Sequence, residues 1–335
     1  MKIVVHGAGV VGASIAWHLA RRGCRDVVVI DRAPEPGGGS TAKATGGFRA
    51  QFDSEINVRL SLLSREKLRT FEAETGVDPG YRPYGYLFLA TTGAALDELR
   101  RAQEIQHACG LAEARIVTAD EARTLNPAIA GPLAGAAFCP TDGFIRPMNI
   151  QRGYMEAAQR LGVAFRFGVE REDGDVFVNA KGPWAGAPVT PLRRNVAATI
   201  ETNVLPDTMP MTIWSEDWFH LRVRDGRVLL LWPDDPPLAD DAWLAEVLRL
   251  TRERVPVLRD VPVDFTWSGF YEMSPDEHAL LGRIRDNEYV AIGSSGHGVM
   301  HAPALGQLLA EIIVDGEASL DVSALRPDRF GPVRM

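Results

Sequence analysis

The sequence predicts a mixed α/β (α+β) protein of two domains, and three observations lead to this prediction. An apolar run at residues 2–6 passes through a glycine-rich turn into a helical pattern at residues 13–22. From about residue 185 to residue 275 the chain changes to short β-like runs. Near residue 289 the first pattern of strand, glycine-rich turn and helix returns. We therefore expect one discontinuous α/β domain and a second, β-rich domain.

The first part of the chain alternates strands and helices. Apolar, β-branched runs typical of buried strands stand at residues 2–6 and 27–30. The second run ends at Asp31, and residues 33–50 form a loop rich in Gly, Pro, Ser and Thr. Helical patterns follow at residues 54–74, 94–109 and 118–125. Thr118 and Glu121 have the spacing of a capping box, which predicts the start of the last of these helices.

The second half carries the β-like runs and one return to the first pattern. Strands are predicted at residues 211–213, 219–223, 228–232 and 289–292. Asp225-Gly226 is typical of a hairpin turn. We expect helices at about 240–254 and at 303–314, the latter after a glycine-rich turn at 293–298.

Composition and charge exclude several classes of protein. The 335 residues correspond to about two domains of ordinary size or one large α/β unit. Hydrophobic residues make up 46% and charged residues 24%, which disfavours disordered, collagen-like and coiled-coil chains. With 36 Lys and Arg against 44 Asp and Glu, the net charge of -8 repels phosphate backbones, so we expect no nucleic-acid partner.

No segment suggests a membrane span, a secretory signal or a metal site. No stretch approaches the roughly 18–20 uninterrupted apolar residues of a spanning helix, and the N-terminus lacks the pattern of a signal peptide, so we expect a cytoplasmic protein. Cys24, Cys109 and Cys139 lie far apart, without C-x-x-C or zinc spacing. We expect them to be buried, small hydrophobic side chains and expect no metal.

The segment Gly7-Ala8-Gly9-Val10-Val11-Gly12 is a G-x-G-x-x-G motif between a strand and a helix. Gly7 permits the tight turn, Gly9 lets a pyrophosphate approach the backbone, and Gly12 allows the helix to pack against the strand. Asp31 ends the next strand, where its carboxylate can bind ribose hydroxyls. The pattern predicts a Rossmann-like dinucleotide-binding unit. The alternative is a glycine-rich turn in an ordinary βαβ unit.

Asp31 argues against a cofactor with a 2′-phosphate, although the neighbouring Arg32 weakens that exclusion. A second small-residue loop at residues 37–47 suits a longer cofactor, because its backbone amides and the Ser40 and Thr41 hydroxyls can bind it. A surface loop without a ligand is the alternative.

Several further motifs lie in the same order along the chain. Together with the first motif they resemble the flavoenzyme family of D-amino-acid, glycine and sarcosine oxidases and dehydrogenases. The resemblance covers most of the chain and rests on residues 7–12 with Asp31, 37–52, Asp142-Gly143 followed by Pro147, 178–185, 273–276 and 295–303.

The resemblance implies FAD as cofactor and a Rossmann-like FAD-binding domain of the glutathione-reductase type, with an antiparallel-sheet substrate domain over the flavin. We place the first domain at residues 1–80, 140–185 and 275–335 and the second at 81–139 and 186–274. The residues expected to hold FAD are Gly7, Gly9, Val10, Val11, Gly12, Asp31, Arg32, Ser40, Thr41, Ala44, Thr45, Gly46, Gly47, Gly182, Trp184, Gly296, His297, Gly298, Val299 and Met300.

Arg49 is the expected substrate residue, because in sarcosine-oxidase-type members the corresponding arginine pairs with the substrate carboxylate; a surface salt bridge is the alternative. His297, His301 and Tyr271 are the other catalytic candidates, and Gln51 and Met300 are further candidates around the substrate. His297 and His301 can instead be capping or packing residues at a helix start, and Tyr271 can be a core aromatic residue.

Four departures from the family shape these expectations. Gly269 stands where such oxidases carry a cysteine attached to flavin, which implies noncovalent FAD. Leu229 replaces a lysine associated with oxygen activation, and Met300 replaces a lysine that binds the carboxylate. Residues 168–175 stand where relatives insert a β-meander, which implies a more open adenine pocket or loss of tight FAD binding.

The resemblance implies oxidation of the C–N bond of an amino acid or secondary amine by hydride transfer to flavin N5, after which the imine is hydrolysed. The departures favour a dehydrogenase or slow oxidase over a fast oxidase. The alternatives are a catalytically weak flavin-fold binding or assembly factor and an NAD-dependent dehydrogenase. The helix at 94–109 and the C-terminal helix are candidate surfaces for a partner subunit, in a homo- or hetero-oligomer.

Overall fold

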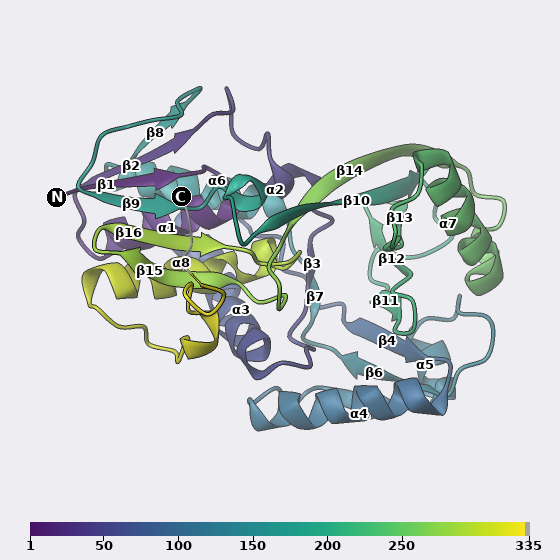
Figure 1. Cartoon of the computed structure of the whole chain (residues 1–335). Helices are drawn as coiled ribbons and strands as arrows, with labels where there is room; N and C mark the ends of the chain where they lie inside the picture. Colours follow the sequence, from purple (N-terminus) through teal and green to yellow (C-terminus); the bar gives the residue numbers. More distant parts are fainter. Residues whose placement is uncertain (332–335) are drawn as a thin grey trace.

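A computed structural model describes residues 1–331, in which two sheets lie side by side (Figure 1). Residues 332–335 of the predicted segment 275–335 lie outside the described residues. The first sheet consists, in spatial order, of β15 (Leu280–Arg285), β16 (Glu288–Ile292), β9 (Val176–Asn179), β1 (Lys2–His6), β2 (Asp26–Asp31) and β8 (Ala164–Phe167). Its neighbours are parallel except for β15, which pairs antiparallel with β16. The carboxyl ends of β1, β2 and β9 therefore meet at one edge.

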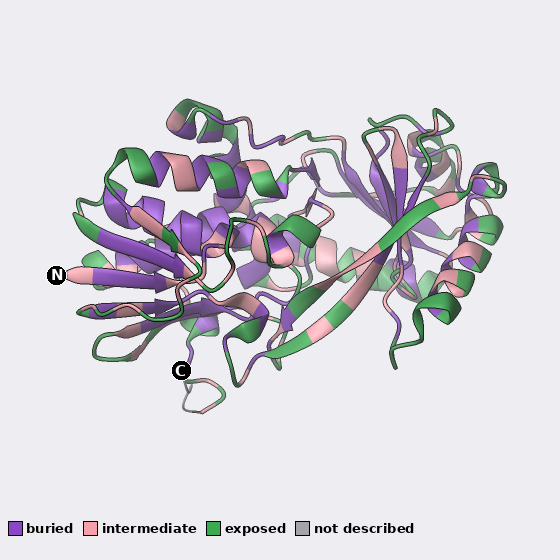
Figure 2. Ribbon diagram, turned by 90° about the horizontal axis from the view of Figure 1, so that it is seen from above, coloured by how far each residue is buried: buried purple, intermediate pink, exposed green. Residues whose placement is uncertain are grey.

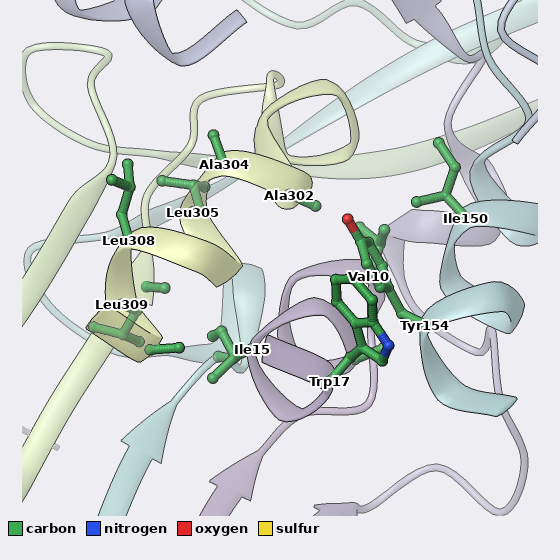
Figure 3. Close-up of a cluster of buried hydrophobic side chains, with 14 of the residues drawn as sticks. Val10, Ile15, Trp17, Ile150, Tyr154, Ala302, Ala304, Leu305, Leu308 and Leu309 are labelled. Carbon is green, nitrogen blue, oxygen red and sulfur yellow. The ribbon is translucent and has the colours of Figure 1, made fainter. Parts of the chain in front are cut away.

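Helices form a layer against the first sheet. The helices α1 (Val10–Arg21), α6 (Pro147–Arg160) and α8 (Gly298–Val314) contact its strands, and α3 (Glu55–Thr75) packs on α6 and α8. Figure 3 shows α1 between α6 and α8, with Trp17 turned toward Tyr154 and Ile15 toward Leu309. The Trp17 and Tyr154 rings lie 5.2 Å apart, and all four side chains are at most 4% exposed. This core fixes the start of α1, and with it the glycine-rich turn.

The opposite face of the first sheet carries a smaller apolar cluster. Val4, Val28 and Ile30 pack there with Val169, which belongs to the segment 168–175 between β8 and β9. Gly168 and Val169 donate backbone hydrogen bonds of 2.8 and 2.9 Å to Ala33 and Asp31. This short segment is therefore tied to the end of β2 and contributes Val169 to the cluster.

The second sheet has eight strands and forms the other half of the molecule. They are, in spatial order, β14 (Val263–Met273), β10 (Thr190–Thr199), β13 (Arg227–Leu231), β12 (His220–Arg224), β11 (Met211–Trp214), β4 (Tyr86–Ala90), β6 (Gly135–Cys139) and β5 (Arg115–Val117). All neighbours are antiparallel except β4 and β11. The strands β10 and β14 reach back toward the first half, and Figure 2 shows much of their surface exposed.

One face of the second sheet packs its own core. Trp243 and Val247 of α7 (Asp240–Arg254) are at most 1% exposed and join a cluster that includes Leu221 and Leu230. The helix α5 (Ala119–Leu125) adds Ala122 to this cluster, and α4 (Gly93–Ala108) packs beside β6. Because side chains alternate along strands, the other face is free to line a site.

A two-stranded sheet connects distant parts of the chain. The strand β3 (Gly47–Phe48) pairs antiparallel with β7 (Gly143–Phe144). Together with α2 (Ser40–Lys43), β3 lies in the segment predicted as a loop. The pairing brings the segment after Phe48 next to Asp142, the residue that precedes β7.

The observed helices confirm the predicted ones, and the last helix differs in where it begins. The predicted helix at 240–254 coincides with α7, and the capping box of Thr118 and Glu121 is formed at the start of α5. The last helix, however, begins at Gly298 rather than at Pro303. The apolar first turn continues the helix through the proline, although Pro303 has no N–H to donate. Of the cysteines only Cys139 is fully buried, whereas Cys24 and Cys109 are partly exposed, which corrects the expectation for those two.

Candidate cofactor and substrate site

A cavity of about 1600 Å³ extends from the carboxyl ends of β1 and β2 to the free face of the eight-stranded sheet. Most pockets for small molecules measure roughly 300–1,000 Å³. The cavity is therefore large enough for an elongated cofactor together with a second, smaller molecule. Its lining includes every residue that the sequence predicted to bind the cofactor except Gly12.

The glycine-rich turn stands at one end of this cavity. Gly7 has φ of +111°, and a Cβ there would lie 2.3 Å from the Ala180 carbonyl oxygen at the end of β9. A Cβ on Gly12 would lie 1.8 Å from the Gly7 oxygen, so this glycine lets α1 pack against the turn. At Gly9 the nearest atom would be the Thr41 hydroxyl at 3.4 Å. The first turn of α1 thus directs backbone N–H groups toward this end of the cavity, which suits an anion.

Asp31 and Arg32 follow the second strand of the same sheet. The Asp31 carboxylate accepts hydrogen bonds of 2.8 Å from the backbone N–H groups of Ala8 and Ala33. Each carboxylate oxygen keeps a further lone pair for another donor. The Arg32 guanidinium lies 5.0 Å from the Trp184 ring, which is 49% exposed.

The second small-residue loop is held by contacts from the other half of the molecule. The Ser40 hydroxyl donates to the Phe270 carbonyl of β14 at 2.7 Å, and the Thr41 hydroxyl accepts from the Val10 N–H at 3.2 Å. The guanidinium of Arg222, from β12, donates to the Thr45 carbonyl at 2.5 Å. Gly46, with φ of +79°, has no room for a side chain, because a Cβ would lie 2.3 Å from the Ile145 oxygen.

The pairing of β3 with β7 places Arg49 and Asp142 side by side. Asp142 is completely buried and accepts hydrogen bonds from the backbone N–H groups of Ala50 at 2.8 Å and Gln51 at 3.3 Å, and from the Gln51 amide at 3.2 Å. Burial raises the pKa of Asp142 to about 6, against the lowering effect of these bonds and of Arg49. Asp142 thereby fixes the backbone that presents Arg49.

The Arg49 guanidinium lies against aromatic rings in the wall of the cavity. It stands 3.7 Å from the Phe52 ring centre and 5.5 Å from that of Phe88, and it donates to the Gln51 carbonyl and to His297 Nε2, the latter at 3.4 Å. Desolvation lowers the pKa of Arg49. Within residues 1–331 no carboxylate lies within salt-bridge distance of it. A cation that faces a cavity and has no anionic partner suits an anionic ligand.

The three other catalytic candidates lie in different surroundings. His297 is the N-cap residue of α8 and lines the cavity, as Tyr271 of β14 does. Desolvation, with the charge of Arg49, holds the pKa of His297 well below its ordinary value. His301 is 1% exposed, lies 2.9 Å from the Ser61 hydroxyl and is not part of the cavity wall. Burial lowers the pKa of His301 to about 3. Because the side chain lies outside the cavity wall, the structure does not bring this candidate to the site.

Met300 and the glycines beside His297 line the cavity at the start of α8. A Cβ on Gly296 would lie 2.6 Å from the Tyr271 ring, so only glycine fits beneath this ring. Leu229, which stands in place of the family lysine, is 1% exposed and does not line the cavity.

Tyr86 and His220 are among the polar residues of the cavity wall that the sequence analysis missed. They come from β4 and β12, and the Tyr86 hydroxyl occupies the place that a Cβ on Gly47 would need. The alternation along each strand does indicate that these residues face away from the core of the second half. The neighbours of these residues, however, depend on the order of the strands.

The described part of the chain contains neither a cluster of metal-binding side chains nor a helix that could cross a membrane. Among residues 1–331 there is no group of three or more His, Cys, Asp or Glu side chains that could hold a metal ion. In the same range, no helix combines the length and the apolar character that crossing a bilayer requires. The compartment in which the protein works stays a prediction.

Comparison with known proteins identifies relatives along nearly the whole chain. The family model of FAD dependent oxidoreductases (DAO) matches residues 2–312. FAD-dependent oxidoreductase domain-containing protein 1 of Xenopus laevis is 27% identical over 98% of this chain and 82% of its own length. Mitochondrial dimethylglycine dehydrogenase of Rattus norvegicus is 28% identical over 98% of this chain, which spans 45% of that enzyme. The structure of L-proline dehydrogenase from P. horikoshii matches with a TM-score of 0.90 and 28% identity over 99% of both chains.

Proposed function

The chain belongs to the family of FAD dependent oxidoreductases, and we propose that it oxidises the C–N bond of an amino acid or a secondary amine. FAD is the cofactor of this family. The observation that carries the substrate class is the Arg49 guanidinium, which faces the cavity without a carboxylate partner among the described residues. The names of relatives, a dimethylglycine dehydrogenase and an L-proline dehydrogenase, support the same class.

The residues at the first end of the cavity fit FAD. The lack of room for a Cβ at Gly7 and Gly12, with Gly9 leaving the backbone uncovered between them, is a cradle built for close backbone approach. The turn at Gly7 and the start of α1 would hold the pyrophosphate, and the Asp31 carboxylate would accept from ribose hydroxyls. The start of α8, at Gly298, would stabilise negative charge on the reduced ring.

When bound, FAD would supply the oxidising chemistry by accepting a hydride from the carbon that carries the nitrogen, and water would hydrolyse the resulting imine. The chain contributes positioning. Arg49 binds the substrate carboxylate through its two parallel N–H groups. Asp142 holds the Arg49 backbone, and the rings of Phe52 and Phe88 fix the guanidinium. The neutral His297 accepts from Arg49 and closes the wall beside it.

We further propose that FAD is held noncovalently and that an acceptor other than oxygen is preferred. Gly269 offers no thiol, and no cysteine of residues 1–331 lines the cavity. The lysine that the family resemblance links to oxygen activation is absent, and its replacement, Leu229, points into an apolar cluster. The division into domains at the predicted boundaries, and any oligomer, stay part of the proposal.

The visible spectrum of the purified protein tests this function. We expect flavin bands, release of the colour into the supernatant after acid precipitation, and anaerobic bleaching by at least one member of a panel of glycine, sarcosine, dimethylglycine, L-proline and D-alanine. Ferricenium and oxygen are then compared as acceptors for the reduced protein. A holoprotein that no amine bleaches would contradict the proposal and favour a binding or assembly role, for which no observation in the structure speaks.

A further inference from the structure

The free face of the eight-stranded sheet presents an ordered row of side chains to the cavity. Strand register places Ala137, Phe88, Ile213, His220 and Leu231 directly opposite one another on β6, β4, β11, β12 and β13. All five line the cavity. Because directly opposite residues project from the same face of a sheet, this register rather than a loop sets their position. His220 is the one polar member of the row.

The hydrogen bonding of His220 determines what its ring can offer. Its Nδ1 lies 2.7 Å from the Trp218 carbonyl oxygen, an atom that can only accept, so Nδ1 carries the proton. Desolvation, with the nearby charge of Arg49, lowers the pKa of His220 to about 4, so the ring is neutral at pH 7. Within residues 1–331 the bond to Trp218 is the one hydrogen bond of the His220 side chain, so the proton-free Nε2 has none. The Nε2 atom is therefore available to accept a hydrogen bond from a ligand in the cavity.

His297 has the opposite arrangement. Its Nε2 faces a guanidinium N–H of Arg49 at 3.4 Å, and a guanidinium can only donate. The Nε2 atom therefore accepts, and the proton of the neutral ring lies on Nδ1. Of the two histidines beside Arg49, His220 is the one with a free acceptor.

We infer that His220 binds the amino group of the substrate, accepting a hydrogen bond from its N–H through Nε2 while Arg49 binds the carboxylate. This inference rests on the proposed function and adds a requirement to it, namely a substrate with an N–H group. Arg49 and His220 are close enough for one molecule, because the guanidinium stands 5.5 Å from the Phe88 ring. Phe88 and His220 are two strand spacings apart, about 10 Å between backbones, and their side chains face the same space. An ether oxygen in place of the N–H would face the Nε2 lone pair and lose this bond.

Two substitutions separate the acceptor from the scaffold. His220→Asn keeps a donor near Nδ1 for the Trp218 carbonyl and removes the acceptor at Nε2, whereas His220→Gln extends an amide oxygen to the position of Nε2. His107→Gln is the control, since His107 Nε2 lies 2.7 Å from the Ala114 carbonyl oxygen, a glutamine amide keeps a donor near that position, and His107 is outside the cavity. The flavin content and the melting temperature of each variant verify that it is folded.

The experiment compares two pairs of ligands that differ at the N–H, sarcosine with methoxyacetate and L-proline with tetrahydro-2-furoate. Dissociation constants come from ligand-induced changes of the flavin spectrum without oxygen, or from the concentration dependence of rapid bleaching where the amine reduces the flavin. In the wild type we expect at least one amine to bind about tenfold more tightly than its ether. His220→Asn should weaken amine binding about tenfold and leave ether binding within twofold, and His220→Gln should restore most of the preference.

An unchanged preference for the amine in His220→Asn, with the protein folded and flavin-loaded, would overturn the inference and leave the proposed function intact. A wild type that binds neither member of either ligand pair would contradict both the inference and the proposed function. The same loss of amine binding in His107→Gln would also overturn the inference, because the effect would then not arise in the cavity.

Discussion

The two ends of the cavity, the proposed cofactor end beside Gly7 and the proposed substrate end beside Arg49, are built in different ways. At the cofactor end the decisive groups are backbone atoms, and Gly7, Gly12 and Gly46 matter because no side chain fits there. At the substrate end the decisive groups are side chains, among them Arg49 and His220, on segments far apart in sequence. A site made of backbone depends on one local turn, whereas a site made of side chains depends on how strands pair. Substitutions at the two ends should therefore have different effects, namely loss of flavin at the first end and weaker ligand binding at the second.

The largest effect is expected at the cofactor end. Gly12→Val places its side chain against the Gly7 carbonyl, where even a Cβ would lie at 1.8 Å, so the turn and α1 must separate. We expect a loss of more than about 4 kcal/mol of stability, as for severe overpacking, and no bound flavin. Flavin content after purification and thermal unfolding measure both.

Gly93→Ala is the control for Gly12→Val. Gly93 is the first residue of α4, and a Cβ there would meet nothing within 4 Å. We expect a stability change within about 1 kcal/mol and normal flavin content. Flavin retention in Gly12→Val would show that the cofactor end tolerates side chains after all, and the comparison between the two ends would fail.

The second prediction concerns Asp142, which joins the segments that bear the substrate end. Its pKa is raised to about 6, so between about pH 4 and pH 6 the native state binds more protons than the unfolded state. The contribution of this carboxyl to the free energy of unfolding should therefore fall by about 3 kcal/mol as pH rises through this window. Asp142→Asn removes this contribution.

Urea unfolding at pH 4, 5, 6 and 7 measures the effect of Asp142→Asn. The difference in unfolding free energy, wild type minus variant, should be about 3 kcal/mol larger at pH 4 than at pH 7. Parallel pH profiles would show that Asp142 titrates as an exposed carboxyl and that the substrate end is not built around a buried one.

The third prediction addresses Arg49 itself. Arg49→Lys keeps the charge and loses the planar pair of donors, so a carboxylate ligand should bind about 2 kcal/mol more weakly, roughly 30-fold in the dissociation constant. Flavin content should not change, since this end of the cavity does not hold the cofactor backbone. Titration with tetrahydro-2-furoate, followed in the flavin spectrum, measures the constant.

Arg115→Lys provides the control, because Arg115 also faces an aromatic ring, that of Phe138 at 5.4 Å, but is outside the cavity. We expect unchanged ligand binding in this variant. If Arg49→Lys loses flavin rather than ligand, Arg49 belongs to the cofactor end, and the assignment of the two ends must be revised.

The smallest effect is expected from removing the N-cap of α5, a local feature of the second half of the molecule. Thr118 accepts a hydrogen bond from the Glu121 N–H at 3.2 Å and caps α5. Thr118→Ala should cost about 1 kcal/mol and leave flavin and ligand binding unchanged. Thermal unfolding and the titration above test this, and a change in ligand binding would mean that α5 positions the substrate face.

The difference between the two ends also explains which residues could be predicted. The Gly7–Gly12 turn and the capping box of Thr118 are local patterns, so they were found from spacing alone. Arg49 was found through a family resemblance, but its neighbour Asp142 lies some 90 residues away and meets it only through the pairing of β3 with β7. His301 was selected for its type and position, yet α8 turns it toward Ser61 and away from the cavity.

The sequence by itself predicted the family and FAD, which the family match confirms, and the turn that we propose holds the cofactor, because a turn that requires glycine is recognisable within a few residues. It also determined most helices, since their apolar periodicity is local. Only the tertiary structure decided the substrate end. His220 and Tyr86 lie in short strands whose sequences do not reveal which strands they pair with, and strand order and register alone brought them to the free face of the sheet.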